Sequence, residues 1–450
     1  MQSRPARCVL VVTVLLAAPA AFGGDWPQWR GPEGNGVSPE TNLPIAWTEA
    51  AGIAWKCKLP EWGTSTPAIW GDALFLTSHV EDRDLVLLRI DKKTGKIQWQ
   101  QVVGSGSADR APALHKSGEA RRQQKFHGDQ NLASPSPVTD GRVVVVHFGN
   151  GDLAAYDFEG HRLWGRNLQK DYGPYTIWWG HANSPVLYRN LVISVCMQDS
   201  CKDLPGDPSS SYVVAHDKQT GEEVWKKLRM TAATAESCDS YTTPIFRRAG
   251  DATEMVLMGG QVLDAYDPAS GRRLWWLAGL GGNRTITGPV AAEGVIYATE
   301  GMRQALLAVR PGGPGPRPRK DIIWKAEQGT PDSPTPVVWG DWLFLVTNDG
   351  IARCLNASDG RQAWKERLPG QYRASPLVAD GRIYFLNTTG LTSVVSAAPR
   401  YNALTQNRLD DSTFASPAVS DGKLFIRGRK WLYCISKGPT SGSTETGLGF

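Results

Sequence analysis

The sequence lacks a strong charge excess, is poor in cysteine, and has a single long apolar run. Its 450 residues include 49 basic and 44 acidic side chains, a balance that does not favour nucleic-acid binding. The apolar run, CVLVVTVLLAAPAA, lies near the N-terminus and is too short to span a bilayer. We therefore expect no membrane span and no nucleic-acid partner.

The two ends of the chain are predicted to lie outside the folded part. Residues 1–24 have the features of a secretory signal, with Arg4 and Arg7 before the apolar run and the small residues AFGG after it. Loss of these two arginines lowers the formal net charge from +5 to +3. No cysteine stands at the expected cleavage region, so we expect no lipid anchor. We expect a monomeric protein that is periplasmic or secreted. Residues 438–450 are poor in apolar side chains and are predicted to be disordered.

The chain has seven cysteines, and Cys8 would leave with the signal. A chain of this length can bury a sufficient core without disulfides. Cys354 and Cys434 stand where other repeats have alanine, so they are predicted to be small buried residues. The candidates for disulfide pairing fall in segments that look irregular: Cys196, Cys201 and Cys238. No HExxH motif is present, and we expect no metal site.

Long helical patterns are also scarce, whereas glycine (48) and tryptophan (18) are frequent, which favours short strands and tight turns. The stretch DKQTGEEVW at Asp217 returns in similar form at Asp91, Asp267 and Asn356. A period of several tens of residues is the mark of a repeat architecture. Each repeat opens with a polar residue, usually Ser or Thr, followed by one of eight prolines: Pro67, Pro137, Pro185, Pro244, Pro289, Pro336, Pro376 and Pro417.

The repeats contain four short strand patterns each, with the exception of the last, as expected for the blades of a propeller. The eighth repeat lacks its fourth strand, and GIAWKCKLP near the N-terminus, with Trp55, can supply it and close the ring. The prediction is an all-β fold over residues 25–437: an eight-bladed β-propeller of four-stranded antiparallel blades, closed by an N-terminal strand that completes the last blade.

The fourth strand of most repeats ends in a tryptophan, and a small residue stands about ten positions before it in several copies. A large ring beside a gap favours packing between blades, so these indoles are predicted to hold the blades together. The seventh repeat has no tryptophan, and Leu404 is expected in its place. The predicted docking residues are Trp55, Trp99, Trp164, Trp225, Trp275, Trp324 and Trp364.

These motifs resemble the tryptophan-docking propellers, a group that includes BamB-type proteins, PQQ-dependent alcohol dehydrogenases and secreted bacterial PQQ-like repeat proteins. The opening DWPQWRGPEGNGVSPE and the closing GKLFIRGRKWLYCI look like the last group in particular. The resemblance implies an eight-bladed ring. For the enzymes it also implies PQQ, Ca²⁺ and an adjacent cysteine pair, but this chain has no Cys-Cys dipeptide and no CxxCH haem motif.

The loops that enter the first strand of each blade are expected to meet at one mouth of the central channel, where a propeller places a ligand. Three interpretations remain open: a rim whose polar groups only satisfy backbone and water, a binding site for a small molecule or peptide, and a catalytic site. The candidate ligand-binding residues are His127, Asn131, Trp179, His181, Asn183, Asp239, Tyr241, Arg284, Asp332 and Arg373, with Phe414 beside them.

The longest departure from the repeat is the insertion from Gly104 to Asn131, which is polar and partly helical in pattern over residues 117–125. It is expected to be a lid, a contact site for a partner or a solvent-exposed loop without a function. No Glu is expected at the channel mouth, where a Ca²⁺ and quinone site would need one.

The function expected from these features is a noncatalytic binding or scaffolding module of the cell envelope, similar to BamB, without a cofactor. Its partner would be an envelope or secreted protein, or a small ligand at the channel mouth. The alternative is a PQQ- and Ca²⁺-dependent oxidoreductase of alcohols or sugars, because the propeller fold by itself carries no function.

Overall fold

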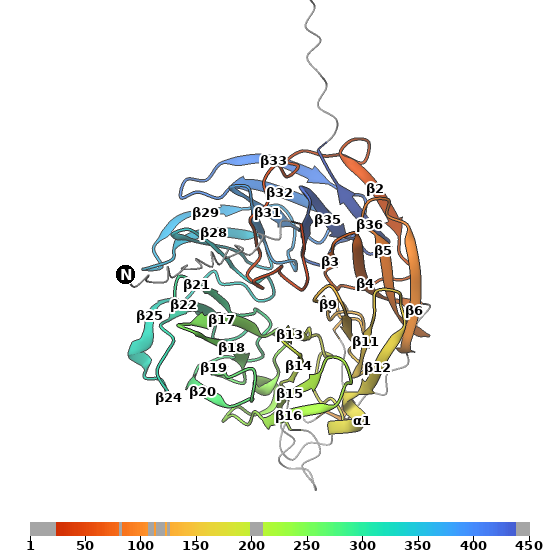
Figure 1. Ribbon diagram of the computed structural model, residues 1–450. Coiled ribbons are helices and arrows are strands. Elements are labelled where there is room, and N and C mark those ends of the chain that lie inside the picture. Colours follow the sequence, from red (N-terminus) through yellow and green to blue (C-terminus); the bar gives the residue numbers. More distant parts are fainter. Residues whose placement is uncertain are drawn as a thin grey trace, which may run out of the picture.

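The computed structural model describes residues 24–80, 83–106, 112–113, 122–123, 127–198 and 210–437. Within this part of the chain, eight four-stranded antiparallel sheets surround a central axis, which confirms the predicted eight-bladed propeller (Figure 1). The first strand of each blade lies toward the axis and the fourth at the perimeter. Almost all of the predicted signal, the predicted disordered tail and Cys201 lie outside the described residues.

The blades are numbered in the chain order of their innermost strands. Blade 1 consists of β3 (Ala68–Trp70), β4 (Ala73–Val80), β5 (Asp84–Asp91) and β6 (Ile97–Ser105). Blade 2 consists of β9 (Val138–Thr139), β10 (Val144–His147), β11 (Asp152–Tyr156) and β12 (Arg162–Asn167). Blade 3 consists of β13 (Val186–Tyr188), β14 (Leu191–Cys196), β15 (Tyr212–Asp217) and β16 (Glu223–Leu228). Blade 4 consists of β17 (Ile245–Ala249), β18 (Ala252–Gly259), β19 (Val262–Tyr266) and β20 (Arg273–Leu277).

The second half of the ring repeats this arrangement. Blade 5 consists of β21 (Val290–Ala292), β22 (Val295–Thr299), β23 (Leu306–Val309) and β25 (Ile322–Ala326). Blade 6 consists of β26 (Val337–Trp339), β27 (Trp342–Val346), β28 (Ile351–Asn356) and β29 (Gln362–Arg367). Blade 7 consists of β30 (Leu377–Ala379), β31 (Arg382–Leu386), β32 (Leu391–Ser396) and β33 (Ala403–Arg408). Blade 8 consists of β34 (Ala418–Ser420), β35 (Lys423–Arg427), β36 (Trp431–Ile435) and β2 (Ile53–Lys58).

Three short helical segments and four further strands are attached to this ring. The helical segments are α1 (Leu168–Tyr172), η1 (Ala235–Cys238) and η2 (Arg319–Asp321). Strand β1 (Val37–Ser38) pairs with the inner edge of blade 7, and β24 (Gly315–Pro316) pairs with the outer edge of blade 4. The remaining pair is β7 (Pro112–Ala113) with β8 (Arg122–Gln123). No helix among the described residues is long and apolar enough to cross a membrane.

The ring closes as predicted, through a strand from the N-terminal end of the chain. Strand β2 pairs antiparallel with β36, which places Trp55 opposite Cys434 and Lys58 opposite Trp431. Blade 8 thereby gains its fourth strand, and its third strand no longer presents unpaired backbone groups.

The hydrophobic core lies between neighbouring blades. Middle strands such as β10 are buried along their whole length and read as continuous apolar runs, because another blade covers each face. The outer strand β16 is instead mostly exposed, and only Trp225 is buried in it. Between blades 3 and 4 this indole packs with Val213, Met255 and Tyr266.

Most of the terminal tryptophans contact the turn of the next blade. Trp164 Nε1 donates a hydrogen bond to the carbonyl oxygen of Lys218 at 2.9 Å, and its ring lies over Gly221. A Cβ atom on Gly221 would lie 2.6 Å from that ring, and the residue also has a φ of +74°. The glycine of the repeated turn is therefore required both by the turn and by the indole packed on it.

A small residue faces the indole across the third and fourth strands, as in the pair Ala215 and Trp225. Cys354 faces Trp364 and Cys434 faces Trp55, and both cysteines are buried free thiols. They occupy the place of the alanine, because a larger side chain would meet the ring.

Several local predictions are wrong. Leu404 does not replace a tryptophan, because it is 38% exposed. The backbone carbonyl of Ile45 instead accepts hydrogen bonds from Thr405 and Asn407 on β33. Cys196 is not in an irregular segment; it ends strand β14 as a buried free thiol.

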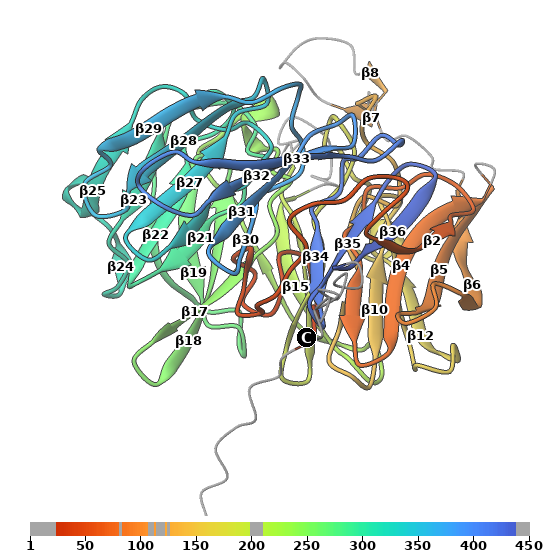
Figure 2. The ribbon, with the colours of Figure 1, turned by 90° about the horizontal axis from the view of Figure 1, so that it is seen from above.

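The insertion after blade 1 carries a short two-stranded sheet. Strands β7 and β8 pair and stand out from one face of the ring (Figure 2). The helix predicted over residues 117–125 is therefore wrong at Arg122–Gln123, and the rest of that stretch lies outside the described residues.

Residues 24–38, which we call the crossing segment, pass through the centre of the ring. Trp26 exchanges two backbone hydrogen bonds with Ile69 of blade 1, and Pro27 accepts one from Thr139 of blade 2. The buried guanidinium of Arg30 then donates to the carbonyl oxygens of Thr335 and Pro336 in blade 6. The segment finally pairs with blade 7 through β1. The repeat pattern did not predict this path.

Candidate functional site: a blind cavity at the channel mouth

A cavity of about 400 Å³ occupies one mouth of the central channel, and we call it the mouth cavity. Its wall is built from the loops that precede the first strands, as the sequence predicted for a ligand site. One hydroxyl side chain from each of six blades lines it, in each case directly before the proline that opens the blade: Thr66, Ser136, Ser184, Thr243, Ser375 and Ser416.

These hydroxyls, which we call the hydroxyl ring, are linked from blade to blade. The backbone N–H of Thr66 donates to Ser136 Oγ at 2.9 Å, and that of Ser136 donates to Ser184 Oγ at 2.9 Å. The same bond joins Ser375 to Ser416 at 3.0 Å. The proline that follows cannot donate, so the residue before it supplies the last N–H of each loop. The hydroxyl ring explains why Ser or Thr precedes proline in seven of the eight repeats.

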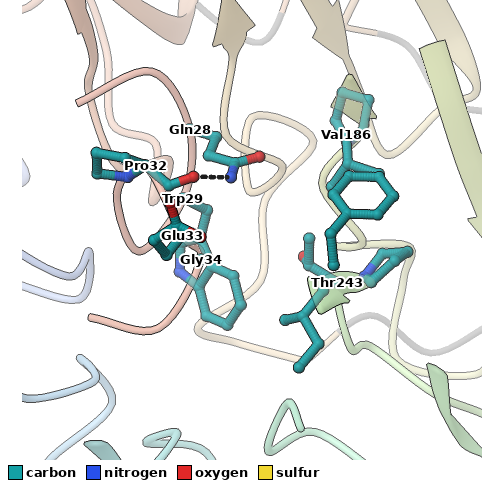
Figure 3. A pocket seen from close by; sticks show the side chains of 11 residues that line it. Gln28, Trp29, Pro32, Glu33, Gly34, Val186 and Thr243 are labelled. Carbon is teal, nitrogen blue, oxygen red and sulfur yellow. Dashed lines mark hydrogen bonds between the residues drawn. The ribbon is translucent and has the colours of Figure 1, made fainter. Parts of the chain in front are cut away.

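The cavity is closed on the side of the crossing segment by Trp29. In the fifth repeat Gly288 replaces the hydroxyl residue, and a Cβ atom there would lie 3.4 Å from the ring of Trp29. Trp29 lines both the mouth cavity and a second cavity of about 40 Å³ behind it. Figure 3 shows this smaller cavity, with the crossing segment on one side and Val186 and Thr243 on the other. The mouth cavity is therefore blind.

One side of the cavity is a rigid cluster around Trp179. Its indole Nε1 donates to Glu236 Oε1 at 2.6 Å, and Arg284 forms an ion pair with the same carboxylate. The Arg284 guanidinium lies 5.3 Å from the Trp179 ring centre, and the His127 ring meets that indole edge to face. Burial opposes ionisation of Glu236, but the bond from Trp179 and the charge of Arg284 outweigh it, so the pKa of Glu236 is lowered.

Two more ion pairs complete the charged part of the lining. Asp129, from the loop before blade 2, pairs with Arg373, from the loop before blade 7, at 3.0 Å. These blades are not neighbours, so the pair connects loops across the mouth. Asp332 pairs with Arg303 at 3.6 Å. Three arginines thus face three carboxylates, and their formal charges cancel.

The structure divides the predicted site residues into two groups. The first group lines the mouth cavity: His127, Trp179, Tyr241, Arg284, Asp332 and Arg373, together with Phe414. The second group is buried away from it and binds backbone or other protein groups: Asn131, His181, Asn183 and Asp239. His181 Nε2, for example, bonds the carbonyl oxygen of Val195, and Asn183 donates to those of Ser240 and Thr242.

Sequence reasoning missed three parts of the site. Glu236 contradicts the expectation that no Glu lies at the mouth, and it escaped notice because the turn η1 has no counterpart in other repeats. Trp29 was missed because it lies in the crossing segment, whose path the repeat pattern does not predict. The hydroxyl ring was visible as the Ser or Thr before each proline, but it was read only as a mark of the repeat.

The two groups are expected to respond differently to truncation. His181 is 1% exposed and stacks on Tyr175 at 4.6 Å, so His181→Ala should lower the free energy of unfolding by about 2–4 kcal/mol. Arg373 is a partly exposed rim residue, and Arg373→Ala should cost less than about 1 kcal/mol. Urea denaturation measures both. Equal losses would show that Arg373 is as structural as His181.

Comparison with protein-family models identifies the family of this chain. The family model described as outer membrane protein assembly factor BamB matches residues 37–198, 209–309 and 318–406. The chain belongs to this PQQ-like propeller family. The matched stretches begin at β1 and reach into β33, so membership in the family rests on most of the ring.

Solved structures support the fold of this PQQ-like propeller. BamB from Moraxella catarrhalis is 14% identical, with a TM-score of 0.57, over 85% of this chain and 97% of that one. A europium-containing methanol dehydrogenase is 11% identical (TM-score 0.62; 90% and 89% covered). The quinohemoprotein alcohol dehydrogenase from Comamonas testosteroni is 13% identical (TM-score 0.64; 96% and 84%). At these identities the likeness shows the fold alone. No curated protein matches the sequence.

The mouth cavity does not offer the donor set that a metal-bound quinone would need. Among the described residues, no group of three His, Cys, Asp or Glu side chains could hold a metal ion. The carboxylates of Asp129, Glu236 and Asp332 are each paired with an arginine. The chain has no adjacent cysteine pair to lie against a quinone ring. The residues present therefore do not fit a PQQ and Ca²⁺ site of the kind that the resemblance implies.

Proposed function

We propose that this chain is an exported propeller that binds a ligand in the mouth cavity and carries no catalytic machinery. The observation that carries the proposal is the blind cavity itself, in which the charged side chains are paired with one another. Paired groups can orient a ligand through their remaining hydrogen-bonding atoms. His127 could act as a base by residue type. Its Nδ1, however, already accepts a hydrogen bond from the backbone N–H of Asp129, so the lone pair of this nitrogen is in use.

The place we propose for this protein is the cell envelope or the space outside it. The predicted N-terminal signal supports export, and the family description names an outer-membrane assembly factor. A role as a binding or scaffolding module agrees with both. In this proposal the mouth cavity binds either a free small molecule or a group that is exposed on an envelope protein.

A titration with PQQ and Ca²⁺ tests the noncatalytic part of the proposal. The purified protein is expected to show no saturable change in quinone absorbance and no dye reduction with alcohols or sugars. The reason is that the mouth carboxylates already bind arginines. Saturable binding together with dye reduction would establish a quinoprotein oxidoreductase and overturn the proposal.

A pair of matched substitutions tests the location of the binding site. Ala182 lines the mouth cavity, so Ala182→Trp places an indole inside it. Ala403 is exposed on the outer strand of blade 7, so Ala403→Trp adds the same side chain elsewhere. In equilibrium dialysis against an envelope extract, the protein and Ala403→Trp should retain the same bound molecules and Ala182→Trp should lose them. Equal retention by both variants would place binding outside the cavity.

A further inference from the structure

The lining of the mouth cavity defines a class of ligand. We propose that the cavity binds a neutral carbohydrate of one or two sugar rings, or the end of a longer glycan. This inference rests on the proposed binding function and names its ligand. Charge, aromatic surface, hydroxyl donors and shape each point to it.

The charge of the lining favours a neutral ligand. Arg373, Arg303 and Arg284 are each paired with a carboxylate, so the ion pairs leave no net charge. Within each pair the field of the guanidinium group is largely offset by that of the carboxylate, so neither an anion nor a cation gains a strong net attraction here. Paired guanidinium and carboxylate groups still keep spare N–H donors and oxygen lone pairs. A sugar hydroxyl both donates and accepts, so it can use both kinds of atom.

Two indoles provide the apolar surface that a sugar ring needs. Trp29 closes the inner end of the cavity and Trp179 stands on its side. The bond from Trp179 Nε1 to Glu236 fixes the orientation of that ring before a ligand arrives. A pyranose ring has one face of C–H groups, which packs on an aromatic surface while its hydroxyls point outward to polar groups.

The hydroxyl ring adds donors that the protein itself does not use. Ser136, Ser184 and Ser375 each line the cavity and each accept one backbone N–H from the preceding blade. Each also has an O–H proton, which finds no acceptor among the described residues. Several such donors around one cavity suit a ligand rich in oxygen acceptors on all sides.

The size and the closed end limit the length of the ligand. A volume of about 400 Å³ lies near the lower end of the range of roughly 300–1,000 Å³ found for small-molecule sites. Trp29 lies at the inner end, and Arg30 next to it is anchored to Thr335 and Pro336. A glycan chain therefore cannot thread through the channel, and only a free sugar or a chain end can enter.

Calorimetric titration of the protein with glucose, maltose and cellobiose tests the inference, with glucuronate and glucosamine as charged counterparts. At least one neutral sugar is expected to bind saturably with one site per chain. Its affinity should not change between about 50 and about 500 mM NaCl, because a neutral ligand is not screened by salt. Preferred binding of glucuronate that weakens with salt would overturn the inference in favour of an anion site.

Two tryptophan variants locate the sugar. Trp179→Ala should weaken the binding of that sugar by at least about tenfold, which corresponds to about 1.4 kcal/mol. Trp339→Ala is the matched control: this indole is 37% exposed, lies at the end of β26 and does not line the cavity, so the variant should bind as tightly as the unchanged protein. Equal binding by both variants would overturn the inference.

Failure of the ligand assignment can be told apart from failure of the proposed function. If none of these sugars binds, but Ala182→Trp still loses the molecules captured in dialysis, the carbohydrate assignment is wrong and the binding function stands. If PQQ binds and dye is reduced, the binding function itself is wrong.

Discussion

Substitution of Trp225 by alanine is expected to lower the free energy of unfolding by about 3–5 kcal/mol, the usual cost of removing a buried aromatic side chain. Trp225 packs between blades 3 and 4 against Ala215, Met255 and Tyr266, so its loss leaves a cavity at a blade interface. Because the ring is closed, no neighbouring blade can shift freely to fill that cavity. Denaturation in guanidinium chloride, followed by far-UV circular dichroism, measures the change.

Two substitutions serve as controls for Trp225. Leu228 lies on the same strand and is 61% exposed, so Leu228→Ala should change stability by less than about 0.5 kcal/mol. A Cβ atom on Gly271 would lie 2.5 Å from the Trp225 ring at a φ of +67°, so Gly271→Ala should also destabilise the fold. A Trp225→Ala protein as stable as Leu228→Ala would refute the docking argument.

Acid is expected to unfold the protein through three buried histidines between blades 2 and 3. Burial lowers the pKa of His181 to about 4, and burial together with the charge of Arg166 lowers that of His216 to about 4. Burial also lowers the pKa of His147 well below its usual range, with a further contribution from His181. All three are neutral in the folded protein at neutral pH.

The sign of the effect follows from these directions. Unfolded histidine binds a proton below about pH 6.5, whereas the folded residues stay neutral until about pH 4. The unfolded state therefore binds more protons, and stability falls as the pH decreases from about 6.5 to about 4. The expected loss at pH 4 is roughly 3 kcal/mol for His181 alone.

Urea denaturation at several pH values between about 7.5 and 4.5 tests this expectation. Depressed carboxylates such as Glu236 lose their contribution only below their unfolded pKa, so they hardly affect this range. A free energy of unfolding that stays constant from neutral pH to pH 4.5 would contradict the assignment of neutral buried histidines.

The candidate site could be located from the sequence only in part. The loops before the prolines were identified because the repeat fixes where each first strand begins. Within a loop, however, the sequence does not tell which side chain faces the channel. In the stretch HANS, His181 and Asn183 are buried within the protein, whereas Ala182 and Ser184 line the cavity.

By itself the sequence determined the number of blades, the strand that closes the ring, and the turn glycines and alternating small residues that the indoles need. The turn glycines and small residues recur in most repeats, because each is a local requirement of turn geometry or strand register, and the count of repeats and the missing last strand follow from the same pattern. Only the tertiary structure decided that Trp29 closes the channel, that Glu236 holds Trp179 and Arg284, and that Asp129 pairs with Arg373 across the mouth. These contacts join segments that have no counterpart in other repeats and lie far apart along the chain, so they exist only once the ring has brought the segments together.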